Sequence, residues 1–384
     1  MIILNKPYVS DFLIETIKKN GFSVLENEVS LKYFSKSDLV DGKTAVEKYE
    51  KEGELFYTNS ENSIDWVEGN LPNSDLNKMI KLSKDKALFR KTLQKIYPDY
   101  FFKASSLEEI KKENPDSLPY PIILKPTVGF LSFGVYPIYD KNDWEQAILK
   151  IDSEIEKLKG IFPSSVVDMN NFIIEKMIEG EEYALDAYFD ENSEATILNI
   201  FKHPFFDGKD VSDRAYYTSK KILEKYLEPF KNVLDKIAKA GGYKNFPFHL
   251  ELRVEEKTGN IIPIEINPLR FCGWCITDIA YFAWGVNVYE AFLNKQKPNW
   301  EKILKEKDDD YYYFTIGDIP SNIERNKIKE IDFDGYLRNV SNLLDLRKID
   351  YKINPIFAIA FGKCKDIEEI KNILKLDMSK YCVL

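Results

Sequence analysis

The stretch Ile-Glu-Ile-Asn-Pro at 264–268, preceded by Phe-His-Leu-Glu-Leu-Arg at 248–253, decides how this chain is interpreted. Both segments are predicted to be strands. Glu265 and Asn267 are two residues apart, so their side chains leave the same face of one strand. Glu251 lies on a strand that can pair with it. Two carboxylates and an amide oxygen that converge favour Mg²⁺ or Mn²⁺, although a solvated hairpin edge is the alternative.

The composition excludes several classes of protein. The chain has 384 residues, 44% hydrophobic and 30% charged, with a net charge of −9. This length predicts two or three domains or subdomains. No basic face is evident, so we expect no nucleic-acid partner. No apolar run approaches the roughly 20 residues of a membrane span, and no secretory signal is evident, so we expect a cytoplasmic protein without a membrane partner.

Residues 1–80 are predicted to form a small α/β domain. The segment lacks the glycine-rich turn of a dinucleotide-binding fold. A helix then follows, with Ser83 as its predicted cap and Lys86 in its first turn. The predicted strands of the small domain are Ile2–Leu4, Phe22–Leu25 and Glu54–Thr58.

Lys125 ends another predicted strand and precedes a loop that contains Gly129, Ser132 and Gly134. Glycines in such a loop let backbone N–H groups approach phosphate oxygens closely. A lysine at the strand end supplies a point charge for the same phosphates. The order of residues is not that of a Walker loop, and a simple hairpin is the alternative.

A third segment begins at Glu175, at the end of a predicted strand, and continues to Glu182. A strand that ends in an acid and leads into an apolar residue, a glycine and paired acids suits a purine pocket with a backbone hinge. The backbone of Lys176 and Ile178 would then contact the adenine edge, and Glu182 would accept the ribose hydroxyls. A charged turn between two strands is the alternative.

In this order, the segments resemble the ATP-grasp superfamily of ATP-dependent carboxylate–amine ligases. The resemblance covers about residues 80 to 295. It implies an α/β and α+β architecture in which two α+β subdomains grip ATP, preceded by a small α/β domain. We therefore expect a preceding domain at 1–80, an ATP-grasp domain at 81–300 with a lid at about 120–180, and an α/β extension at 301–384. That extension either completes the substrate site or forms a homodimer contact.

The resemblance also implies a role for each matching residue. The loop at 129–134 would close over the nucleotide as a lid. The implied ligands are Lys86 and Lys125 for the α- and β-phosphates, Glu175, Lys176 and Ile178 for adenine, Glu182 for ribose, and Glu251, Glu265 and Asn267 for one or two Mg²⁺ ions.

In the family, a substrate carboxylate attacks the γ-phosphate, and an amine then displaces phosphate from the acyl phosphate. The common pattern has arginine directly after Asn-Pro, but here Leu269 intervenes before Arg270. Arg270 is still the best candidate to bind a substrate carboxylate or the transferred phosphoryl group, because its planar fork suits both. A salt bridge to a neighbouring acid is the alternative. Further substrate candidates, which flank a polar loop, are Lys202, His203 and Arg214.

The predicted function is that of an ATP- and Mg²⁺-dependent ligase that joins a small carboxylate to an amine, with an amino acid as the favoured acid. Two alternatives use the same scaffold: a phosphotransferase and a nucleotide-binding regulator without catalysis. No lysine-tether motif of a biotinylated carrier is evident, so a carboxylase role is not supported.

Overall fold

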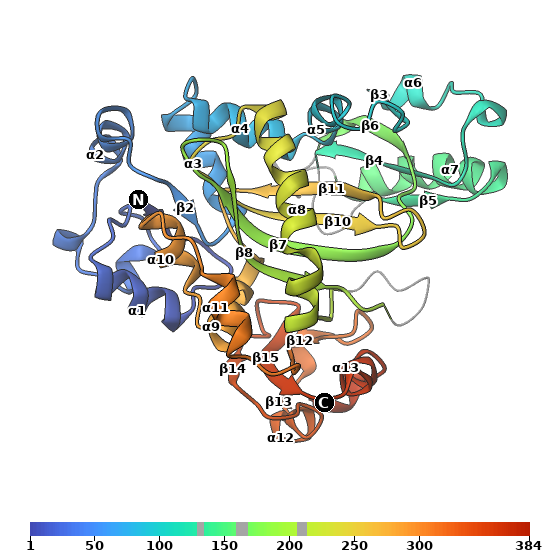
Figure 1. Cartoon of the computed structure of the whole chain (residues 1–384). Coiled ribbons are helices and arrows are strands. Elements are labelled where there is room, and N and C mark those ends of the chain that lie inside the picture. Colours follow the sequence, from blue (N-terminus) through green and yellow to red (C-terminus); the bar gives the residue numbers. More distant parts are fainter. Residues whose placement is uncertain (129–133, 159–167, 206–212) are drawn as a thin grey trace.

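The computed structural model describes residues 1–128, 134–158, 168–205 and 213–384 (Figure 1). Its larger sheet has eight strands in the order β11-β10-β7-β8-β9-β12-β15-β14, and its smaller sheet has four in the order β3-β6-β4-β5. Neighbouring strands are antiparallel in both sheets. The smaller sheet consists of β3 Phe102–Ser106, β4 Ile122–Val128, β5 Tyr136–Ile138 and β6 Asp168–Lys176. The larger consists of β7 Glu181–Phe189, β8 Ala195–Lys202, β9 Ala215–Ser219, β10 Phe246–Val254, β11 Ile261–Pro268, β12 Tyr311–Asp318, β14 Asp345–Lys348 and β15 Ile356–Cys364.

Helices flank these sheets and form much of the N-terminal unit. The longest of those described is α8, whose N-cap Ser219 accepts a hydrogen bond from the Ile222 N–H, and which ends at the left-handed Gly242. The α-helices are α1 Asp11–Asn20, α2 Gly42–Glu47, α3 Ile64–Asn70, α4 Asp75–Lys84, α5 Lys86–Leu93, α6 Leu107–Ile110, α7 Lys141–Leu158, α8 Lys220–Gly241, α9 Ile279–Trp284, α10 Val288–Leu293, α11 Trp300–Lys305, α12 Phe333–Leu337 and α13 Ile367–Leu374. No helix in the described ranges combines the length and apolar character needed to cross a bilayer.

The N-terminal unit differs from its prediction in one strand. Ile2–Ile3 (β1) and Tyr57–Thr58 (β2) pair in parallel, as two of the three predicted strands require. The predicted strand at Phe22–Leu25 is not formed, because Val24 and Leu25 make only isolated bridges. The remaining short strands, β13 Glu330–Ile331 and β16 Cys382–Val383, pair with each other near the C-terminus.

The smaller sheet forms a separate layer with α6 and α7, at the upper right of Figure 1. Its apolar core includes Ile122, Leu124, Trp144 and Phe172. Lys125 lies on β4 and Glu175 lies on the neighbouring β6, two residues apart in register. Gly134 follows with a φ of 69°, whereas the predicted phosphate-loop residues Gly129 and Ser132 lie outside the described residues.

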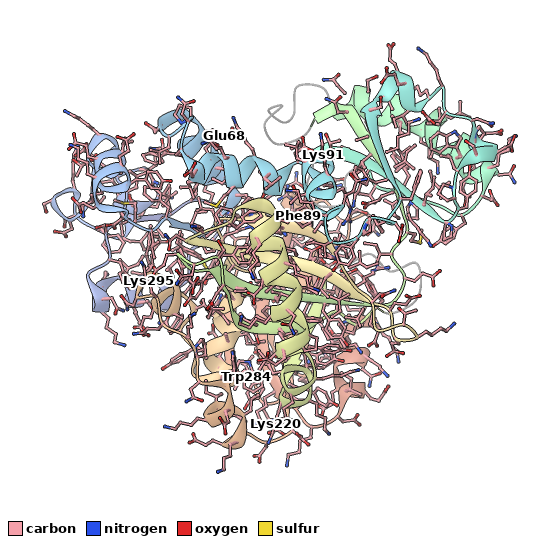
Figure 2. The ribbon with its side chains drawn as sticks, turned by 45° about the horizontal axis from the view of Figure 1, so that its top comes forward. Glu68, Phe89, Lys91, Lys220, Trp284 and Lys295 are labelled. Atoms are coloured by element: carbon pink, nitrogen blue, oxygen red, sulfur yellow. The ribbon has the colours of Figure 1, made fainter. Side chains whose placement is uncertain are left out.

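The larger sheet has one apolar face and one mixed face. Leu185, Phe248 and Leu250 belong to the core that includes the buried residues of α8. Figure 2 shows Lys220 at one end of α8 and Phe89 of α5 beside the other. Because successive strand residues alternate between faces, His249 and Glu251 lie on the opposite face. That face carries the candidate site.

Apart from the short β13–β16 pair, the strands beyond residue 300 join the larger sheet. Strand β12 pairs with β9, and β15 and β14 follow it, so three C-terminal strands extend the larger sheet. Phe314, Ile359 and Phe361 on these strands are buried in the second core, together with Phe271 and Ile279.

The start of α5 also differs from its prediction. Asp85, not Ser83, is the N-cap, and its side chain accepts hydrogen bonds from the N–H groups of Ala87 and Leu88. Ser83 lies inside α4, where its hydroxyl donates to the Met79 carbonyl. Both residue types cap helices well, so the sequence alone does not fix which one does so. Lys86 is the first residue of α5 and thus lies in its first turn, as predicted.

Candidate active site

Two acidic residues face each other across β10 and β11. Glu251 pairs directly with Glu265, and His249 pairs with Asn267 in the next row on the same face. The register shifts after Glu251, which leaves Ile264 as the extra residue of a bulge. Bulges bend a strand locally and are common beside active sites. The predicted convergence of Glu251, Glu265 and Asn267 on one face is therefore present.

The two carboxylates of this pair have different electrostatic surroundings. Burial raises the pKa of Glu251 well above its usual range, and the carboxylates of Glu265 and Glu182 raise it further. Glu265 is also buried, but Lys86 lies 2.9 Å from its Oε2 and holds its pKa below normal. The site thus has one carboxylate with a cationic partner, Glu265, and one, Glu251, that forms no hydrogen bond within the described part of the chain. Such a pair is electrostatically incomplete.

A second charged cluster joins the two sheets through α5. Arg90 Nε lies 2.5 Å from Glu175 Oε2, and Lys125 Nζ lies 2.5 Å from Glu175 Oε1. The other guanidinium nitrogens of Arg90 donate to the Pro263 and Ile264 carbonyls on β11, at 2.5 and 3.2 Å. Although burial opposes ionisation, the two cations lower the pKa of Glu175 to about 2. Burial, together with Arg90 and Lys86, lowers the pKa of Lys125.

Arg253 bridges two residues of the hinge segment, Ile178 and Glu182. Its Nη1 donates to the Ile178 carbonyl at 2.9 Å, while its Nε and Nη2 donate to Glu182 Oε2 at 3.1 and 3.0 Å. His203 Nδ1 lies 3.3 Å from Glu182 Oε1. Gly180 turns the chain with a φ of 106°, and a Cβ there would collide with the Val254 carbonyl. Glycine is therefore required at this turn.

The hinge backbone also has partners within the smaller sheet. The Lys176 carbonyl accepts a hydrogen bond from the Tyr100 hydroxyl at 2.6 Å, and the Lys176 N–H donates to the Phe101 carbonyl at 3.0 Å. Ile178 is buried. The segment from Glu175 to Glu182 is therefore fixed at both ends.

Arg270 lies at the end of β11 and contacts the N-terminal unit. Its Nε and Nη2 donate to Glu61 Oε1 at 3.0 and 2.6 Å, and its Nη1 donates to the Phe271 carbonyl. Glu61 also pairs with Lys84 at 2.9 Å. Burial opposes ionisation of Glu61, but Arg270 and Lys84 lower its pKa to about 2. The salt bridge that was the alternative for Arg270 is thus present, and its binding of a substrate carboxylate stays a prediction.

The three further substrate candidates are not brought together. Lys202 pairs with Glu181 and lies over the Tyr183 ring, on the apolar face of the sheet. Arg214 pairs with Asp318 and donates to carbonyls near the C-terminus. His203 lies beside Glu182, stacked on Tyr216 at a centroid distance of 4.1 Å. His203 is therefore nearest to the hinge.

Four residues that contact side chains of this site were not themselves predicted: Arg90, Arg253, Glu61 and Asp186. Arg90 was detectable, because it follows Lys86 by four residues and shares its helix face. Arg253 was detectable in the same way, because it follows Glu251 by two residues on a strand. Glu61 gave no local signal, since its partner Arg270 is 209 residues away in sequence.

The residues at the acidic pair fit a hard divalent cation. Oxygen donors from two carboxylates and one amide suit Mg²⁺, which usually keeps other ligands from water or phosphate. No group of three or more His, Cys, Asp and Glu side chains is placed to hold a metal within the described ranges, so a site here depends on Asn267 as the third protein donor. The raised pKa of Glu251 is the expected response of a buried acid whose counter-charge is incomplete.

Residues 118–278 match the family model of the ATP-grasp domain. This range contains the Lys125–Glu175 cluster, the hinge and the acidic pair. The chain therefore contains a segment, residues 118–278, that matches the ATP-grasp family. The predicted superfamily is confirmed.

The chain is similar to D-alanine–D-alanine ligase from Bacillus anthracis, with 25% identity over 181 residues, which are 45% of the chain and 51% of the relative. The chain thus spans about half the length of the curated relatives it matches. Its structure resembles that of an L-amino acid ligase from Bacillus licheniformis, with a TM-score of 0.67, 16% identity and coverage of 99% and 96%. It also resembles N5-carboxyaminoimidazole ribonucleotide synthetase from Thermotoga maritima, with a TM-score of 0.64, 15% identity and coverage of 100% and 98%. These likenesses confirm the predicted fold class.

Proposed function

We propose that this ATP-grasp protein is an ATP- and Mg²⁺-dependent ligase that activates a small carboxylate as an acyl phosphate and joins it to an amine. The observation that carries the proposal is the Glu251–Glu265 pair, directly opposed across β10 and β11 with Lys86 on one member. Two similar proteins are, by name, a D-alanine–D-alanine ligase and an L-amino acid ligase. We therefore favour an amino acid as the activated acid.

Two charged clusters support the proposed nucleotide binding: Lys86 with the acidic pair, and Lys125 with Glu175. Lys86, which contacts Glu265, and Lys125 would supply the cations for the phosphates, and both lower the pKa of Glu265. Adenine binds at the hinge formed by Glu175, Lys176 and Ile178, with Glu182 at the ribose. In the proposed complex, Glu182 keeps one oxygen for the ribose while Arg253 holds the other. The remaining lid residues proposed to cover the phosphates are Gly129, Ser132 and Gly134.

Glu251, Glu265 and Asn267 would hold Mg²⁺ or Mn²⁺. When bound, the cation neutralises charge on the transferred phosphoryl group. The chain's own contribution is positioning and charge balance, which dominate phosphoryl transfer. Lys86 is fixed by Glu265, Lys125 by Glu175, and Arg270 by Glu61, so the three cations need little reorganisation before reaction.

The reaction then has two steps with balanced atoms. A carboxylate oxygen of the acid forms a bond to the γ-phosphorus, and ADP leaves with the electron pair of the broken P–O bond. An amine nitrogen then bonds to the acyl carbon, and phosphate leaves with the pair of the broken C–O bond and takes up the amine proton. Arg270 would bind the acid in the first step, exchanging part of its contact with Glu61.

A trapping assay tests this function. The full chain is incubated with ATP, Mg²⁺ and each of the twenty common amino acids or D-alanine, with and without hydroxylamine. An acyl phosphate gives a hydroxamate, and ligation without hydroxylamine gives ADP, phosphate and an amide-linked product. ADP formation with one acid, a stable phosphorylated product and no hydroxamate would instead support a phosphotransferase. Absence of ATP turnover under all conditions would contradict both and leave a nucleotide-binding regulator.

A further inference from the structure

A buried carboxylate and a histidine form a pair in the row next to the acidic pair. Asp186 on β7 lies opposite His249 on β10, which in turn lies opposite Asn267 on β11. His249 Nδ1 lies 2.7 Å from Asp186 Oδ1. Neither residue belongs to the apolar cores of the sheet. Burying polar side chains of this kind costs free energy unless they are hydrogen-bonded or paired.

Asp186 is fully buried and holds its partners firmly. Besides His249, it accepts hydrogen bonds from the Cys272 N–H at 2.8 Å and from the Thr277 hydroxyl at 2.6 Å. Because a carboxylate oxygen accepts hydrogen bonds, Nδ1 of His249 is the donor in this contact. In the neutral form of the ring, Nε2 then carries the lone pair.

The ring geometry directs this lone pair away from Asp186. The two ring nitrogens point in divergent directions, and Nδ1 is bound on the β7 side. Within the described residues, Nε2 forms no hydrogen bond. His249 is 6% exposed, so the ring is buried while a small part of it stays accessible. A buried acceptor with a fixed direction is suited to a ligand donor.

The strand register shows which part of a ligand lies there. On one face of β10, Arg253 and Glu182 form the row at the hinge, Glu251 and Glu265 form the next row, and His249 and Asn267 form the row after that. Rows on one face are about 6.6 Å apart, which is two residues of strand rise. If the hinge row holds the nucleoside and the middle row holds the phosphates, the third row lies beyond the γ-phosphate, where the acyl group must form.

We propose that His249 Nε2 accepts a hydrogen bond from the N–H of the attacking amine and thereby directs the nitrogen lone pair at the acyl carbon, with Asp186 as the positioning residue. This inference rests on the proposed function and names the residue that binds its second substrate. The ligand class is a primary amine, because it offers an N–H donor and a nucleophilic lone pair on the same atom. In this proposal the amine proton leaves with phosphate, as in the reaction above, and His249 contributes orientation.

The test compares two nucleophiles. Hydroxylamine at high concentration attacks acyl phosphates without being positioned, whereas a bound amine gains most from orientation. The full chain is given ATP, Mg²⁺ and a mixture of the twenty common amino acids and D-alanine, and hydroxamate and amide products are measured separately. The variant is His249→Asn, whose side-chain amide can keep the bond to Asp186 but lacks an atom at the position of Nε2.

We expect His249→Asn to lower amide formation by about 10-fold or more, with a raised KM for the amine, and to leave hydroxamate formation within about 2-fold. Asp186→Asn should lower amide formation selectively as well. His249→Gln, whose side-chain amide reaches toward the Nε2 position, should recover part of the rate of amide-product formation. It also replaces His249→Asn as the test variant if the latter folds poorly. His203→Asn is the matched control at the other histidine and should change both products by the same factor.

Three results would overturn the inference. If His249→Asn keeps the full amide rate, Nε2 does not bind the amine. If both products fall together, His249 acts on activation of the acid. If the wild-type chain gives no hydroxamate, the activation step is absent and the proposed function fails first, which is a different outcome from loss of selectivity between nucleophiles.

Discussion

Glu175 is the residue whose replacement has the most calculable consequence. It lies between Arg90 and Lys125, and its side chain is almost completely buried. Glu175→Gln keeps the shape of the side chain and removes its charge. Two buried cations then lose their common counter-ion, and breaking a buried pair in this way is strongly destabilising.

The magnitude follows from the pKa of the carboxyl. In the folded chain it is lowered from 4.5 to about 2 by Arg90 and Lys125, which outweigh the opposing effect of burial. A lowering of this size corresponds to about 3 kcal/mol of stability at neutral pH. Because the folded pKa is the lower one, this stability is complete above about pH 4.5 and is lost as the pH falls toward 2. Roughly 40% of it should be gone by pH 3.5.

Urea unfolding measured by tryptophan fluorescence checks both statements. At pH 7 the variant should be less stable than the wild type by about 3 kcal/mol, and this difference should shrink by roughly 40% between pH 7 and pH 3.5. Glu181→Gln is the matched control, because Glu181 pairs with Lys202 in a partly exposed position and should cost less than about 1 kcal/mol. Equal stability of Glu175→Gln and wild type at pH 7, or a difference that does not change with pH, would refute the reasoning.

Three further outcomes concern the proposed ligase. Mg²⁺–ATP at about 100 times its dissociation constant should stabilise the chain by about 2.7 kcal/mol, and Lys125→Met should remove most of the resulting thermal shift; no shift with either ATP or ADP would count against nucleotide binding. Glu265→Gln should lower kcat far more than it lowers nucleotide affinity, because the charge it balances peaks in the transition state, and near-normal turnover would exclude it as a metal ligand. Arg270→Lys should weaken binding of the acid by about 1.5–3 kcal/mol while ATP binding is kept, whereas a loss of ATP affinity at unchanged KM for the acid would assign Arg270 to the phosphates.

The sequence predicted individual strands better than it predicted which strands pair with each other. The pairing of 248–253 with 264–268 followed from a short turn between two strands and is confirmed by the register. That β7 pairs with β10, about sixty residues later in the chain, had no local signal. The strand expected at Phe22–Leu25 failed for a related reason, because Val24 and Leu25 each gain only one bridge. Strand formation depends on partners that a local pattern does not identify.

The same limit applies to the site. Alternation along one strand was sufficient to place Glu265 and Asn267 on one face, and the resemblance ordered the other segments. Partners from distant elements were not accessible in this way. Glu61 belongs to the N-terminal unit, and Asp186 acquires its role only through the strand register that sets it beside His249. The sequence therefore predicted residues that define the family pattern and missed those that fix their orientation.

The C-terminal residues bear on the substrate end through one buried side chain. Arg347 on β14 donates to the Cys275 carbonyl and to Asp278 Oδ2, both at 2.7 Å. This segment needs such support, because Trp274 and Cys275 have φ values of 56° and 55°, a conformation that costs non-glycine residues about 1–2 kcal/mol each.

Asp186 holds the same segment from the other side, through the Cys272 N–H and the Thr277 hydroxyl, and also orients His249. A shift of β14 would therefore reach His249, in the row proposed to bind the amine, through Asp186. Of the two roles left open for residues 301–384, this arrangement favours support of the substrate site, since β14 stabilises the segment without supplying a side chain to the acidic pair.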